Sequence, residues 1–155
     1  MARAKGGNAP ARQISVEGLD DFRRDLNRYA KDLGGGKALG KVNKEIAEFY
    51  SGKADDIGRG LGGVHAHVVR QKSIRARGAQ KRSEIVLGGQ GQKHGPAMGA
   101  EFGSNTYAQF PAHRGSGSGA GYMLYPAIRE NADEGAEMYW DAVEDLAARA
   151  FPNKR

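Results

Sequence analysis

The stretch 73–87, SIRARGAQKRSEIVL, contains two short runs in which every second residue is apolar or small. These positions are Ile74, Ala76, Ile85 and Leu87. Alternation with a period of two is typical of β-strands that bury one face. The four residues Gly78 to Lys81 lie between the runs and predict the turn of a β-hairpin.

A helical pattern precedes this hairpin. From about Lys37, apolar residues recur at helical spacing on one face: Leu39, Val42, Ile46, Phe49 and Ile57. Three glycines, Gly52, Gly58 and Gly60, weaken the later turns of this helix, because glycine is an unfavourable residue in a helix interior. The alternating pattern is expected to begin after Gly62.

The N-terminal part of the chain predicts three further features. Residues 1–11 are basic and polar and are expected to form a flexible arm. Residues 12–16 alternate as a short strand would, and Glu17-Gly18 turns the chain. Residues 19–33 carry an apolar helical stripe that stops at three consecutive glycines, 34–36.

The C-terminal part predicts one long helix. Pro126 suits its first turn, where a missing N–H costs nothing, and Pro152 ends it before a short tail, 152–155. One face is apolar or small: Ile128, Ala132, Tyr139, Val143, Leu146 and Ala150. Residues 97–102 suit either a third strand or a short helix, and the glycine- and serine-rich segment 104–120 predicts a long flexible loop.

Together these patterns predict a single α+β domain over residues 12–151. Two N-terminal helices and a long C-terminal helix would pack on a small antiparallel sheet, covering one of its faces.

The composition limits the classes of function. The chain has 155 residues, a net charge of +6, 24 glycines and no cysteine, so disulfides and thiolate chemistry are excluded. The N-terminus lacks the apolar core of a signal peptide, and no apolar run reaches the ~18 residues of a membrane span. We therefore expect a soluble protein assembled in the cytoplasm, without a membrane partner.

The charge is divided between two blocks. Six bases and no acid lie between positions 70 and 82: Arg70, Lys72, Arg75, Arg77, Lys81 and Arg82. Seven acids and no base lie between positions 130 and 145: Glu130, Asp133, Glu134, Glu137, Asp141, Glu144 and Asp145. Opposite charges on two surfaces allow copies to pair head to tail, which closes into a ring at a suitable angle. Alternatively, the bases contact nucleic-acid phosphates, although the stretch lacks the aromatic residues that single-strand binders stack on bases.

Three arrangements resemble chemical sites. His65 and His67 would lie on one side of a strand, a spacing that metals can use with a third ligand from His94, Glu101 or His113, but four scattered histidines are more often plain surface or interface residues. Residues 88–93 are glycine-rich but lack the Gly-Lys-Ser/Thr ending of a phosphate loop. No nucleophile or carboxylate pair stands out, so the sequence predicts no catalytic residue, no metal and no cofactor.

Three distinctive segments carry a family resemblance. In chain order they are Val16–Phe22 (VEGLDDF), Gly99–Ser104 (GAEFGS) and Gly121–Arg129 (GYMLYPAIR), with a glycine-rich loop through Gln109-Phe110-Pro111 between the last two. In this order they resemble the tail-completion, or head–tail joining, proteins of long-tailed bacteriophages. The segment 56–61 keeps only a glycine and a leucine of that family's Pro-x-x-Thr-Gly-x-Leu pattern, which indicates a divergent branch.

The resemblance implies a structural virion protein of the phage neck or tail and not an enzyme. Such proteins form a ring, commonly a hexamer, between the head connector or stopper and the tail tube, with DNA passing through the channel. It implies architectural roles for Glu101, Phe102, Gly103, Tyr125, Pro126 and Ala127, with Phe102 under the final helix. The basic block would meet Glu134, Glu137 and Asp141 of a neighbouring copy or line the channel, and the loop 104–120 would order against a neighbour. The alternative is a basic DNA-binding accessory protein.

Overall fold

The computed structural model describes residues 35–89 and 95–150. Seven elements are found there: α2 Gly35–Leu61, α3 Gly63–Arg70, β1 Ile74–Ala79, β2 Arg82–Leu87, α4 Ala97–Phe102, α5 Leu124–Glu130 and α6 Ala132–Ala150. The predicted arm, the strand 12–16, the helix 19–33 and the tail lie outside the described residues.

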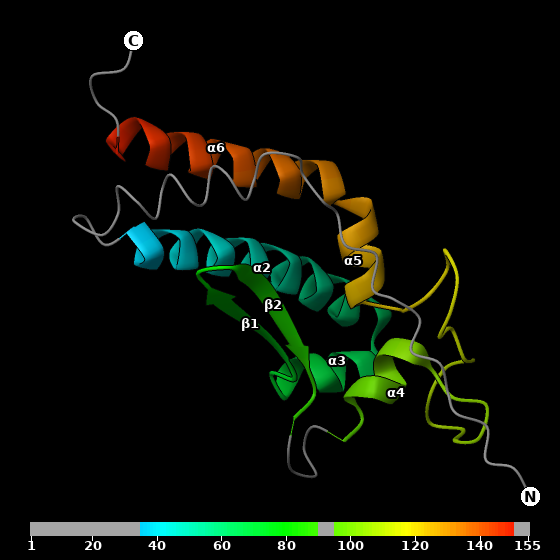
Figure 1. Ribbon diagram of the computed structural model, residues 1–155. Coiled ribbons are helices and arrows are strands. Elements are labelled where there is room, and N and C mark those ends of the chain that lie inside the picture. Colours follow the sequence, from blue (N-terminus) through cyan, green and yellow to red (C-terminus); the bar gives the residue numbers. More distant parts are fainter. Residues whose placement is uncertain (1–34, 90–94, 151–155) are drawn as a thin grey trace, which may run out of the picture.

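The long helix α2 is the centre of the fold. The β1–β2 hairpin packs along one side of α2, and α6 lies along another (Figure 1). The α+β class and the long C-terminal helix are thus confirmed. In the described part of the chain α2 covers the sheet, whereas α6 packs on α2.

The hairpin is antiparallel, with Ile74 opposite Leu87 and Ala76 opposite Ile85. The pairing extends to Ala79 and Arg82, so the turn is tighter than the sequence predicts. The hairpin tip is fixed to α2 because the Asn43 amide donates to the Ala79 carbonyl at 2.6 Å. A side chain at Gly78 would collide with the backbone of α2, so only glycine allows this approach.

The prediction that the period-two pattern begins after Gly62 is wrong, because residues 63–70 form the helix α3. The apolar residues Val64, Val68 and Val69 fit helical spacing, and Val68 and Val69 are buried. Packing on α2 decides the conformation of this short β-branched segment against its strand propensity.

The C-terminal region differs from the single predicted helix. Residues 97–102 form the short helix α4, which resolves the alternative left open by the sequence. The final helix is divided at Asn131, whose side chain donates to the Ala127 carbonyl at 2.8 Å. Pro126 does lie in the first turn of α5. Because of the break, the predicted face is discontinuous: Val143 is buried, whereas Ile128 is exposed.

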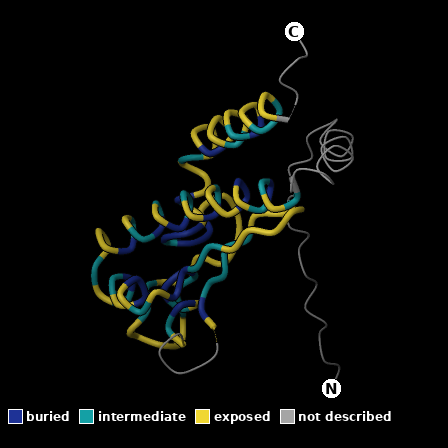
Figure 2. The backbone as a smooth tube through the Cα atoms, turned by 90° about the vertical axis from the view of Figure 1, so that its left-hand side faces the viewer, coloured by how far each residue is buried: buried dark blue, intermediate teal, exposed yellow. Residues whose placement is uncertain are grey.

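The main core lies where α2, α3, α4 and α5 meet the hairpin (Figure 2). Its buried members are Ala54, Val68, Ile74, Ala97, Ala100, Met123, Leu124 and Ala127. Several are alanines, so the elements approach closely, and Met123 fills the remaining space as an adaptable side chain.

Candidate functional site

The most constrained site is a corner formed by α4 and α5. Glu101 at the end of α4 is fully buried, yet its carboxylate is satisfied. Oε2 accepts the backbone N–H groups of Met123 at 3.1 Å and Leu124 at 2.9 Å, and Oε1 accepts that of Tyr125 at 3.0 Å. The first N–H groups of a helix have no partner within the helix. Glu101 therefore caps α5 from another element, where the helix dipole also favours a negative charge.

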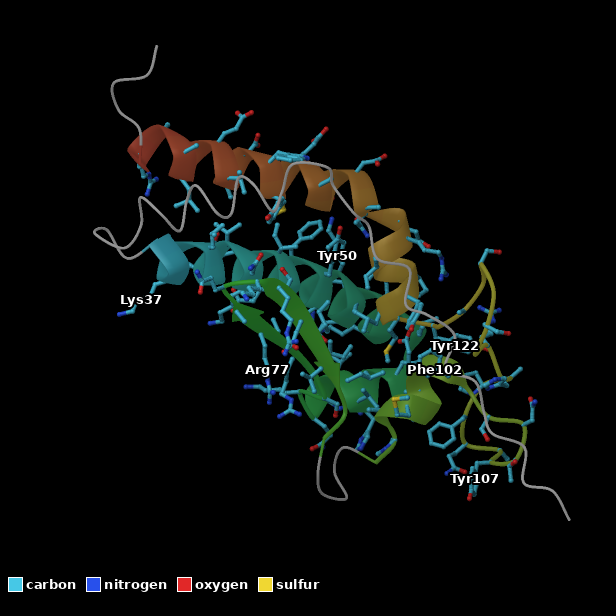
Figure 3. The ribbon with its side chains drawn as sticks, in the orientation of Figure 1. Lys37, Tyr50, Arg77, Phe102, Tyr107 and Tyr122 are labelled. Atoms are coloured by element: carbon cyan, nitrogen blue, oxygen red, sulfur yellow. The ribbon has the colours of Figure 1, made fainter. Side chains whose placement is uncertain are left out.

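Two neighbours of Glu101 complete this corner. The ring of Phe102, labelled in Figure 3, meets that of Tyr125 edge to face, with centroids 5.4 Å apart. Gly103 has φ 70° and ψ −176°, a conformation that is essentially restricted to glycine. The carbonyls of Pro111 and Ala112 lie directly against its Cα, where a larger residue would place its Cβ.

The segment 104–120 contains no helix or strand. The segment folds back on itself, because Ser104 N–H donates to the Pro111 carbonyl at 2.8 Å, and it is tied to the corner by Arg114 N–H, which donates to the Phe102 carbonyl at 2.6 Å. The Arg114 guanidinium also lies 4.4 Å from the centroid of Tyr122. Tyr107, by contrast, points into solvent at the outer end of the loop (Figure 3). Ordering of this loop against a neighbour stays a prediction.

The six residues expected to be architectural therefore lie together. We call this set, Glu101, Phe102, Gly103, Tyr125, Pro126 and Ala127, the α4–α5 corner. Phe102 contacts α5, which is the first part of the predicted final helix. The sequence carried no signal for the cap made by Glu101, because the carboxylate and its donors are 22 to 24 residues apart.

The predicted basic interface residues lie at the end of α3 and on the hairpin. Arg75 is half-buried and donates from Nη2 to the Gly88 carbonyl at 2.6 Å, while Arg82 pairs with Glu84 at 2.6 Å. Four others have side chains on the surface: Arg70, Lys72, Arg77 and Lys81. Arg77 lies on the hairpin, on the side of α2 remote from α6 (Figure 3).

The predicted acidic interface residues lie on α6. Glu134 is already paired with Lys53 of α2, with Nζ and Oε2 2.9 Å apart. Glu137 and Asp141 are exposed, and neither forms an ion pair with another residue in the described part of the chain. The structure does not bring the acidic and basic sets together within one chain, because the hairpin and α6 pack on different sides of α2.

A groove runs between α2 and the edge of β1 that faces away from β2. Its lining residues are Lys44, Glu48, Ser51, Gly52, Asp55, Lys72, Ile74, Arg75, Ala76 and Arg77. Two of these residues also carry a polar atom, Ser51 Oγ and Arg75 Nε, that is shielded from solvent and has no hydrogen-bond partner within the described residues. Burial raises the pKa of Asp55 above its usual value, and Asp56 adds to this, while the charge of Arg59 opposes it. Sequence reasoning found the bases of this groove but missed the α2 residues that form its other wall.

The predicted pair of metal-binding histidines is not formed. His65 and His67 are two residues apart on a helix, not a strand, so their side chains point in different directions. His65 is buried against the Tyr122 ring, with centroids 5.5 Å apart, and His67 is exposed. Within residues 35–89 and 95–150 no three His, Cys, Asp or Glu side chains gather closely enough to hold a metal ion. His94 and most of the segment 88–93 lie outside the described residues.

Comparisons with protein-family models, with curated proteins and with solved structures found no match. None of the described helices combines the length and the apolar character that a membrane-spanning segment requires.

Proposed function

We propose that this chain is a structural subunit of a bacteriophage neck or tail. It would assemble with copies of itself into a ring, commonly of six, that completes the tail and joins it to the head connector. It performs no catalysis in this role. It belongs in the virion, in contact with connector and tail-tube proteins and with DNA passing through the channel.

The observation that carries this proposal is the α4–α5 corner. The Glu-Phe-Gly segment and the Tyr-Pro-Ala segment are separated by more than twenty residues, yet one segment caps and packs the start of the other. Such interdependence explains why both segments would occur together in proteins of one architecture, and it supports the resemblance on which the proposal rests.

The charge distribution supports the assembly part of the proposal. Arg77 on the hairpin and Asp141 on α6 are exposed on different sides of α2, so neither set can neutralise the other within a subunit. Pairing between copies would satisfy both sets.

A second candidate function is binding of DNA phosphates by the exposed bases Arg70, Lys72 and Arg77. Electrostatic binding of this kind predicts an affinity that falls steeply as salt is added. A measured affinity that hardly changes between low and moderate salt would exclude this second candidate.

Deletion of the coding sequence from the genome that carries it, followed by induction of particle production, tests the preferred function. We expect heads and tails to accumulate separately in electron micrographs. Expression of the wild-type chain in trans should restore joined particles, whereas a frameshifted copy should not. Normal particles formed without the chain would contradict the proposal.

A further inference from the structure

We propose that the groove beside β1 is the docking site for Trp140 on α6 of a second copy of this chain. The inference rests on the proposed self-assembly and names the contact that would produce it.

The groove has an open place for a large side chain at Gly52. Five residues on one stripe of α2 form one wall: Lys44, Glu48, Ser51, Gly52 and Asp55. Gly52 lies in this stripe without a side chain, and a Cβ built on it would meet no atom of the described residues within 4 Å. The glycine therefore leaves this part of the wall open to a large side chain.

The opposite wall is cationic. Consecutive residues of β1, from Ile74 to Arg77, line the groove together with Lys72, which lies just before the strand. Lys44 of the α2 wall is paired with Glu48 at 3.3 Å.

The complementary feature is an exposed tryptophan within an acidic surface. Trp140 is 44% exposed, although its ring packs edge to face with Tyr139 at a centroid distance of 6.0 Å. Glu137 lies three residues before Trp140 and Glu144 four residues after it, so both acids border it on the helix surface. Tryptophan and arginine are the residues most enriched at the energetic centres of protein interfaces.

The two features match in chemistry. Arg75 and Arg77 can lie against the indole face as cation–π partners, while a flanking acid pairs with Lys72. Nucleic acid fits this groove less well, because Glu48 and Asp55 form part of its wall and would repel phosphates. The mixed charge of the groove thus favours a protein helix that brings both acids and an apolar ring.

The two surfaces also lie in the relation that a ring requires. The α2 residues Lys53 and Tyr50 face α6, whereas Gly52 and Glu48 belong to the stripe that faces the groove. One copy therefore offers its groove to one neighbour and its Trp140 to another. Such head-to-tail contacts close into rings when the rotation between copies allows it.

A mixing experiment with two complementary variants tests this contact. Trp140→Ala removes the docking side chain but leaves the groove open. Gly52→Gln fills the groove but keeps Trp140. Gly60→Gln is the matched control, since a Cβ at Gly60 also meets nothing within 4 Å, but this residue lies outside the groove. Circular dichroism checks that all three fold, and analytical ultracentrifugation reports their mass.

We expect the wild-type chain and Gly60→Gln to form the same oligomer. Each of the other two variants alone should associate at least about tenfold more weakly, as for loss of an interface hot spot. An equimolar mixture of these two should form dimers, because one intact groove and one intact Trp140 remain, and it should form no larger ring.

Several results would overturn the contact. If both variants assemble as well as the wild type, the proposed contact is wrong. The proposed function is then tested separately, by deletion of the coding sequence and electron microscopy of the particles. A mixture that stays monomeric would exclude pairing of the groove with Trp140. A wild-type chain that stays monomeric but binds duplex DNA, with binding lost on Arg77→Glu, would make the groove a nucleic-acid contact.

Discussion

The Glu101 carboxylate accepts the backbone N–H of Leu124 at 2.9 Å, across 23 residues of sequence. This bond and its two neighbours fix where α5 begins, and Gly103 allows the chain to leave α4 at the required angle. The corner thereby sets the position of α5, which continues through Asn131 into the acidic helix α6.

Replacing Glu101 by alanine should destabilise the fold strongly. Three backbone donors would lose their acceptor in a buried place, which costs about 2–4 kcal/mol in the free energy of unfolding. Urea denaturation measures this cost. Glu48→Ala is the exposed control and should change stability by less than about 0.5 kcal/mol. Equal effects of the two changes would contradict the role of Glu101 as a cap.

Gly103→Ala should be more harmful than Gly62→Ala. Both glycines have a positive φ near 70° and a nearly extended ψ, so both substitutions carry backbone strain of about 1–3 kcal/mol. Only at Gly103 would the new Cβ also collide with backbone carbonyls, since Gly62 has open space around it. Thermal melting of the two variants compares them, and a lower midpoint for Gly62→Ala would refute the collision.

Gly135→Ala should weaken the packing of α6 on α2. The Tyr50 hydroxyl lies directly where the new Cβ would stand, and over-packing of this kind costs about 1–3 kcal/mol (Figure 3). Gly60→Ala lies in a helix with free space and should instead stabilise the chain by about 0.5–1 kcal/mol. Urea denaturation should give a lower free energy of unfolding for Gly135→Ala and a higher one for Gly60→Ala. If both substitutions lower it, the collision with Tyr50 is not the cause.

Asp55→Asn should stabilise the protein at neutral pH and have little effect in acid. Burial raises the pKa of Asp55, so its neutral form suits the folded state better than its charged form. Its contribution to stability is full below the unfolded value of 3.8 and is lost as the pH rises through the raised pKa. Asparagine stays neutral throughout. Chemical denaturation at pH 3 and pH 7 tests this, and a variant less stable than the wild type at pH 7 would contradict it.

The hairpin and the long helices were predictable because their patterns are local. Ile74 and Ile85 alternate with polar neighbours on either side of a turn, and Leu39 and Val42 share one face of a helix. Helix α3 was not predictable in this way, because its run of valines and histidines is short and its conformation depends on packing against α2.

The candidate sites were predictable only as groups of residues. The three resemblance segments indicated that Glu101 and Tyr125 matter, but the bond between them crosses the whole connecting loop. The groove depends on Gly52 and Ser51 of α2 lying beside Arg75, a proximity that arises from tertiary packing and has no local signal.

The mass of the purified chain in solution tests the central claim most directly. Light scattering over a range of concentrations should give one defined closed oligomer whose mass stays constant with concentration. Added salt should dissociate it, because exposed ion pairs are screened. A mass equal to that of one chain, about 16.6 kDa, at every concentration and salt level would contradict self-assembly through complementary surfaces.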